Sequence, residues 1–122
     1  MSGSPPSSAS TSVHQLVVGD LLVKHPGSRT RGFKRSVTES LDGQLELPWL
    51  RIVPDLYEVS PGLVIAYEVE DTHRVDRSKL RAYARLWAAL DELDWELRLV
   101  IVDIRGGRLE PNLAEVYYHQ PG

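Results

Sequence analysis

The sequence contains no cysteine, which excludes disulfide bonds, thiolate metal ligands and cysteine nucleophiles. This absence is typical of a reducing compartment, and we expect a cytoplasmic location. No apolar run approaches the roughly 20 residues that span a bilayer, so no transmembrane helix is expected. No basic and then apolar leader opens the chain, so secretion is not expected. Metal ligands must come from carboxylates and the four histidines.

The chain also lacks an excess of positive charge. Its formal net charge is −3, whereas a protein that coats nucleic acid by bulk charge is basic. The basic residues are nevertheless clustered in two stretches, 24–35 without any acid and 74–85 with only Asp76. The first holds Lys24, Arg29, Arg31, Lys34 and Arg35, and the second holds Arg74, Arg77, Lys79, Arg81 and Arg85. We therefore expect two local positive surfaces on a near-neutral protein.

The length of 122 residues is that of one domain with one core. Residues 1–12 are rich in serine and proline and predict a disordered tail, so the domain is expected over 13–122. Val13–Lys24 predicts a helix, with Ser12 as a candidate cap and Pro26-Gly27 as a stop. The stretch 33–44 allows no assignment.

The sequence patterns that predict secondary structure are clearer in the second half of the chain. Leu45–Val53 predicts a strand that 56–59 continues, and the Ser60-Pro61-Gly62 turn returns it as a hairpin to a strand over Leu63–Glu70. Asp76 predicts the N-cap of a helix over Arg77–Leu90.

The nearly unbroken apolar run Leu97–Asp103 predicts a strand covered on both faces, and a short edge strand is expected near 115–119. A strand, a helix and a strand in this order imply a right-handed parallel crossover. The expected fold class is α/β, with a small mixed sheet flanked by helices.

The helix predicted over Arg77–Leu90 has two distinct faces. Apolar residues recur at spacings of three and four, at Leu80, Tyr83, Ala84, Trp87 and Leu90. The opposite face carries Arg77, Arg81 and Arg85. These arginines form either an ordinary solvated face or a row of phosphate contacts. The same two interpretations stand for the loop residues Arg29, Arg31, Lys34 and Arg35.

Three carboxylates are expected at one end of the predicted hairpin. Side chains alternate along a strand, so Glu68 and Glu70 lie on the same face at the end of Leu63–Glu70. The turn at Pro61-Gly62 folds Asp55 back toward them. Neighbouring carboxylates repel one another, and a hard cation such as Mg²⁺ compensates that repulsion. The pattern therefore predicts a divalent metal site.

Pro54, Asp55, Glu68 and Glu70, followed by a basic helix, resemble the PD-(D/E)XK nuclease superfamily over roughly Leu45–Gly107. The resemblance implies a restriction-endonuclease-like αβββαβ core. It also implies that Asp55 and Glu68 hold Mg²⁺, with Mn²⁺ as a substitute. The third motif position is usually lysine, and here it is Glu70, as in some active restriction endonucleases of the superfamily.

The resemblance implies metal-dependent hydrolysis of phosphodiester bonds in DNA, with a metal-activated water attacking the phosphate. Asp55, Glu68 and Glu70 are the expected metal ligands, and Lys79 is the candidate to replace the missing lysine. His73 is a second candidate for the general base, and Asp20 or Glu39 for the acid that many members carry on the first helix.

A domain of this size offers little surface for duplex recognition. We therefore expect either a homodimer or a branched, nicked or phage-related DNA substrate. The alternative function is a catalytically inactive protein of the same fold that acts in nucleic-acid binding or assembly.

Overall fold

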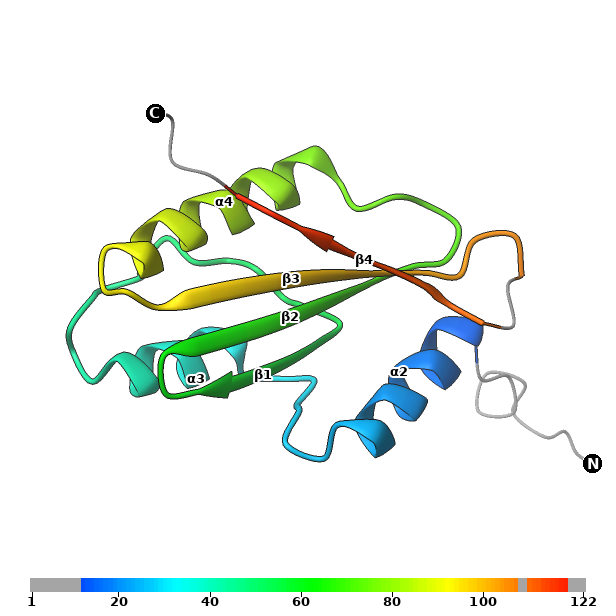
Figure 1. Ribbon diagram of the computed structural model, residues 1–122, viewed down its shortest axis with the longest axis horizontal. Helices are drawn as coiled ribbons and strands as arrows, with labels where there is room; N and C mark the ends of the chain where they lie inside the picture. The colour runs from blue at the N-terminus through cyan, green and yellow to red at the C-terminus, as the bar shows by residue number, and fades with distance from the viewer. Residues whose placement is uncertain (1–11, 108–109, 119–122) are drawn as a thin grey trace, which may run out of the picture.

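The structure is a computed structural model that describes residues 12–107 and 110–118. The described residues form three helices and one four-stranded sheet (Figure 1). In chain order the elements are α2 (Val13–Lys24), α3 (Phe33–Leu41), β1 (Leu56–Ser60), β2 (Leu63–Glu70), α4 (Arg77–Asp91), β3 (Glu96–Asp103) and β4 (Asn112–Val116). The predicted α/β class with a small mixed sheet is confirmed.

The strands follow the order β1-β2-β3-β4 across the sheet. The hairpin between β1 and β2 pairs Ser60 with Leu63, and Gly62 closes the turn at a φ of +80°. A residue with a side chain rarely adopts that backbone conformation, so glycine suits this turn. The pairing places the first residues of β1 beside the last residues of β2, with Leu56 opposite Tyr67.

The parallel crossover from β2 through α4 to β3 is also confirmed. β2 and β3 pair in parallel from Leu63 opposite Glu96 to Glu70 opposite Asp103. The Asp76 side chain accepts a hydrogen bond from the Ser78 N–H at 3.2 Å, which satisfies one of the free donors at the start of α4. The carboxyl ends of both parallel strands therefore meet at one edge, close to the point where α4 begins.

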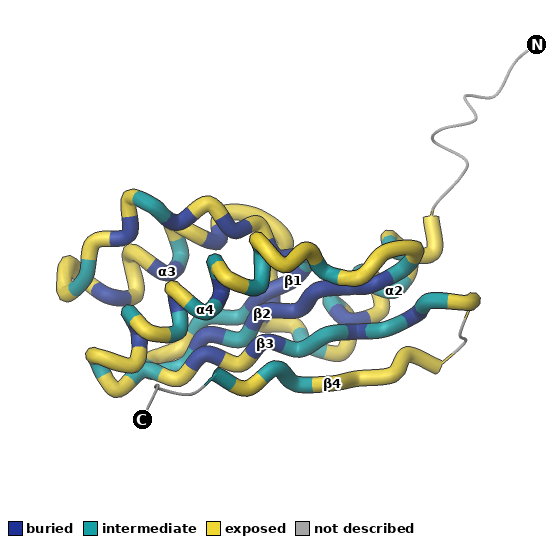
Figure 2. Tube along the Cα trace, turned by 90° about the horizontal axis from the view of Figure 1, so that it is seen from above, coloured by how far each residue is buried: buried dark blue, intermediate teal, exposed yellow. Residues whose placement is uncertain are grey.

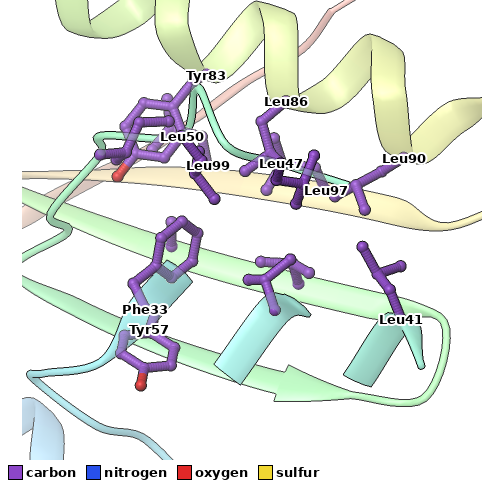
Figure 3. Close-up of a cluster of buried hydrophobic side chains, with 14 residues drawn as sticks. Phe33, Leu41, Leu47, Leu50, Tyr57, Tyr83, Leu86, Leu90, Leu97 and Leu99 are labelled. Atoms are coloured by element: carbon purple, nitrogen blue, oxygen red, sulfur yellow. The ribbon is translucent and has the colours of Figure 1, made fainter. Parts of the chain in front are cut away.

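The two faces of the sheet carry separate apolar clusters. On one face α3, α4 and the segment 45–52 pack against β2 and β3, and Figure 3 shows Tyr83, Leu86 and Leu90 of α4 pointing toward the strands. On the other face α2 contributes Leu21 to a smaller cluster with Tyr67 and other strand residues. Figure 2 shows that β2 is largely buried between its neighbours, whereas much of β4 is exposed. The strand that carries Glu68 and Glu70 is therefore the most enclosed element of the sheet.

The strand predicted over Leu45–Val53 is wrong, because this stretch forms no strand in the structure. Leu47, Leu50 and Ile52 are buried, yet they belong to an irregular segment that covers the core. Pro48 and Pro54 lack the backbone N–H that sheet pairing requires, which disfavours a ladder at both ends of the stretch.

The element order therefore has two helices before the sheet and an added strand, β4, after it, in place of αβββαβ. The stretch without an assignment contains α3, and the last strand runs over Asn112–Val116 rather than 115–119. α4 also buries Leu86, which was not part of its predicted apolar face.

The start of the folded region agrees with the prediction for Val13–Lys24. Ser12 caps α2, with its side chain accepting from the Gln15 N–H and the Gln15 side chain accepting from the Ser12 N–H, both at 3.1 Å. Residues 1–11 of the predicted tail lie outside the described residues. No helix in the described part of the chain is long and apolar enough to cross a membrane.

Candidate active site

The candidate site lies at the carboxyl end of β2, where α4 passes over the sheet. Glu68 and Glu70 are 4% and 9% exposed, and they share the face of β2 that α4 covers. Asp55 sits just before β1 and is fixed against β2 by two hydrogen bonds. Its N–H donates to the Tyr67 carbonyl at 3.1 Å, and its Oδ2 accepts from the Val69 N–H at 2.7 Å. The hairpin thus brings Asp55 beside the end of β2, as predicted.

Two side chains of α4 hold the Glu68 carboxylate. The Tyr83 hydroxyl donates to Glu68 Oε2 at 2.6 Å, and Lys79 Nζ lies 2.9 Å from Glu68 Oε1. Lys79 Nζ also donates to the Val53 carbonyl at 2.9 Å. Lys79 is therefore brought to the carboxylates from the following helix, the position from which it was predicted to replace the missing lysine.

Burial dominates the electrostatics of Glu68. It raises the pKa of Glu68 above its ordinary value, because the charged form loses its contact with water. The hydrogen bonds from Tyr83 and Lys79 oppose this rise, and the nearby negative charge of Asp55 adds to it. Burial also raises the pKa of Tyr83, with a further contribution from Glu68. Tyr83 therefore stays protonated and acts as a hydrogen-bond donor.

His14 joins the site from the other face of the sheet. Its Nε2 lies 3.1 Å from Asp55 Oδ1, so the two Asp55 oxygens have different partners, His14 and the Val69 N–H. The sequence does not single out His14, which has no ligand spacing to another histidine. Tyr83 was interpreted as core packing alone. Neither contact has a sequence signal, because each depends on how a helix packs on the sheet.

Glu70 belongs to a second group of charges. Its Oε2 accepts from the Val75 N–H at 2.7 Å and so holds the link between β2 and α4. Its register neighbour Asp103 binds the Arg105 guanidinium through both oxygens, at 3.0 and 3.1 Å. The hydrogen bond to Asp103 raises the pKa of Arg105, and the charge of Glu70 contributes. A guanidinium group therefore already balances the acids on this side of the site.

The acidic candidates on the two leading helices, Asp20 and Glu39, each pair with a basic residue of their own helix. Asp20 and Lys24 form an exposed ion pair at 2.9 Å, as do Glu39 and Arg35. Neither pair involves Asp55 or Glu68. His73 is exposed in the link before α4.

The predicted nucleic-acid contacts are all exposed. In the first basic stretch, the Arg29 backbone pairs with Tyr57, and Lys34 Nζ donates to the Pro48 carbonyl at 3.2 Å. The guanidinium of Arg85 stacks over the Trp49 ring at 4.1 Å from its centroid, which ties α4 to the 45–53 segment. The exposed residues of the two stretches are Arg29, Arg31, Lys34, Arg35, Arg77, Arg81 and Arg85.

Two carboxylates, Asp55 and Glu68, are the candidate donors for a hard cation. Mg²⁺ commonly takes one or two carboxylates from a protein and completes its shell with water and substrate phosphate oxygens. Asp55 and Glu68 supply that number of carboxylates, and each of their four oxygens already has a partner within the chain, namely Tyr83, Lys79, His14 or the Val69 N–H. Within residues 12–107 and 110–118, no group of three or more acidic or histidine side chains is arranged to hold a metal ion. Glu70 is therefore not gathered with the other two into a three-carboxylate site.

The comparisons with known proteins leave the fold and the site as the only guides to function. No family model matches the sequence, and no curated protein matches it.

Proposed function

We propose that this chain is a metal-dependent nuclease that hydrolyses phosphodiester bonds of DNA. The observation that carries the proposal is the convergence of Asp55, Glu68 and Lys79 from three different segments of the chain. Two carboxylates are a common protein contribution to a Mg²⁺ site, and an ammonium group beside them can stabilise the charge of a phosphate. The hairpin and the parallel crossover that position them are the parts of the proposed restriction-endonuclease-like core that this fold contains, whereas the strand expected over Leu45–Val53 is missing from it.

In this proposal Asp55 and Glu68 hold Mg²⁺ or Mn²⁺. When bound, the cation lowers the pKa of a coordinated water and neutralises charge on the phosphate. The chain's own residues prepare the site. The Val69 N–H and His14 orient Asp55, and Tyr83 orients Glu68. Lys79, held by Glu68 and the Val53 carbonyl, supplies a positive charge that stabilises the phosphoryl oxygens.

The test is cleavage of supercoiled plasmid with Mg²⁺ or Mn²⁺ against EDTA. We expect metal-dependent nicking that Asp55→Ala and Glu68→Ala both abolish. Lys79→Met should lower the rate by about 10²–10³-fold, because one preorganised charge is removed. Glu46→Ala is the matched control, since Glu46 is an exposed acid away from the site. Far-UV circular dichroism establishes that each variant is folded.

One observation favours the alternative of an inactive nuclease-fold protein that binds nucleic acid. Both Glu68 oxygens already have partners within the chain, Lys79 and Tyr83. Salt-dependent DNA binding without nicking in any metal would establish that alternative and overturn the nuclease proposal. The homodimer stays a prediction, and sedimentation of the purified chain tests it.

A further inference from the structure

A groove runs along the start of α3, beside the candidate site. It has a volume of about 640 Å³ and lies between the first turns of α3 and the segment 50–54. Its lining is mostly apolar, with the exposed Val53 at its edge and the buried core residues Phe33 and Leu50 beneath it. We call it the α3 groove and define it by Arg31, Phe33, Lys34, Arg51, Val53 and Pro54.

The α3 groove has a positive rim. Among the residues that the structure describes, four basic side chains line it and one acid does, Glu39, which is paired with Arg35. The four are Arg31, Lys34, Arg35 and Arg51, all exposed. This rim stands out on a chain whose formal net charge is −3. The positive end of the α3 dipole at Gly32, which has no side-chain cap, adds to the same potential. The charge of the groove is therefore complementary to a polyanion.

The α3 groove shares one wall, the segment 51–53, with a hollow that reaches the candidate site. Pro54 lines the groove, and the next residue is Asp55. On the other side of the segment 51–53, a second hollow of about 350 Å³ reaches Lys79. Lys79 also donates to the Val53 carbonyl, so the wall of the groove and the ammonium group are joined directly. The groove and the Lys79 ammonium group therefore lie on opposite sides of one short segment of the chain.

An apolar lining suits unpaired nucleotides better than a duplex. In a duplex the bases are stacked and paired, and the backbone presents mainly charged phosphates to a protein surface. Unpaired nucleotides expose their base faces and sugars, which gain from contact with apolar side chains inside a positive groove. We therefore propose that the α3 groove binds an unpaired DNA segment adjacent to the cleaved bond. The location of the cut rests on the proposed nuclease function, whereas binding in the groove does not.

The experiment measures binding in EDTA, where no cleavage occurs. The probe is a fluorescein-labelled oligothymidine of about 12 nucleotides, within the usual site sizes of such grooves. Lys34→Glu is compared with Lys24→Glu, because both lysines are exposed on helices and only Lys34 lines the groove. Val53→Asp is compared with Val23→Asp, since these valines are 70% and 81% exposed and only Val53 lines the groove.

We expect Lys34→Glu and Val53→Asp to weaken oligothymidine binding by about tenfold or more, with a shallower salt dependence for Lys34→Glu. The matched controls should stay within about twofold. A duplex of the same length should bind the wild type more weakly and be less sensitive to Val53→Asp. Equal losses in variant and control, or a preference for the duplex, would overturn the proposal.

The two proposals fail in different ways. If the groove variants lose oligothymidine binding but no DNA is cut with any metal, the groove proposal is supported and the nuclease proposal is overturned. If plasmid is nicked in an Asp55-dependent way while the groove variants bind oligothymidine like the wild type, the groove proposal falls. Binding of an acidic peptide as tightly as oligothymidine would also contradict it.

Discussion

The two ends of β2 bury different kinds of side chain on the same face of the sheet, apolar at one end and acidic at the other. At the turn end, Val64 and Ala66 are fully buried among leucines from neighbouring elements. Hydrophobic burial stabilises the fold there without any polar partner. At the carboxyl end, Glu68 and Glu70 are almost as buried but carry charge, and each requires donors from elsewhere. Burying a carboxylate costs free energy, and at this end of β2 hydrogen-bond donors from other segments offset that cost. Such an arrangement is typical of a functional site.

The largest effect is expected at the apolar end. Leu99 is fully buried and pairs in register with Ala66. Leu99→Ala should lower the free energy of unfolding by about 2–5 kcal/mol, because it removes methyl groups and leaves a cavity. Urea denaturation measures the change. If Leu99→Ala lowered the free energy of unfolding no more than a surface substitution does, burial at the apolar end would not be a main source of stability.

A smaller effect is expected at the charged end. Tyr83→Phe removes the donor to Glu68 Oε2 and should lower the free energy of unfolding by about 1–3 kcal/mol, since a buried carboxylate oxygen is left without a partner. The control is Tyr118→Phe, whose hydroxyl donates to the neutral Leu80 carbonyl and should cost about 0.5–1.5 kcal/mol. Equal costs would contradict a special role for the charged acceptor.

The third effect concerns the pH dependence of stability. Folding raises the pKa of Glu68, chiefly through burial, so the folded state binds this proton more tightly than the unfolded state. The resulting stabilisation is present below the unfolded pKa and is lost as the pH rises through the raised folded pKa. Glu68→Gln removes this titration.

In metal-free buffer, the melting temperature of Glu68→Gln relative to the wild type should therefore rise from acid to neutral pH. Glu46→Gln serves as an exposed control with no such trend. A relative melting temperature that falls with pH would mean that the partners of Glu68, rather than its burial, dominate its pKa.

Local patterns predicted the second half of the chain well. The strand over Leu63–Glu70 and the N-cap at Asp76 follow from a tight turn, a continuous apolar run and a capping residue, which act within a few residues. The same holds for the helix over Val13–Lys24. α3 also had a local signal, because its buried residues Phe33, Val37 and Leu41 recur every four positions.

The wrong strand over Leu45–Val53 shows the limit of local patterns. Apolar residues in that segment indicated burial correctly, but burial alone does not establish pairing with a neighbouring strand. The site shows the same limit. The two motifs located Asp55 and Glu68, whereas His14 and Tyr83 reach them only through helix packing that no spacing in the sequence records.

Lys79 and Tyr83 lie four residues apart, so they stand on the same side of α4, one turn from each other. One carboxylate, Glu68, contacts both. A shift of α4 by a single residue would rotate that side by about 100° and separate both groups from Glu68 at once. The rotation of α4 about its own axis thus determines where the ammonium group of Lys79 lies relative to Glu68. Substitutions that repack the helix against the sheet will move Lys79 and Tyr83 relative to Glu68 even when they lie far from the acids.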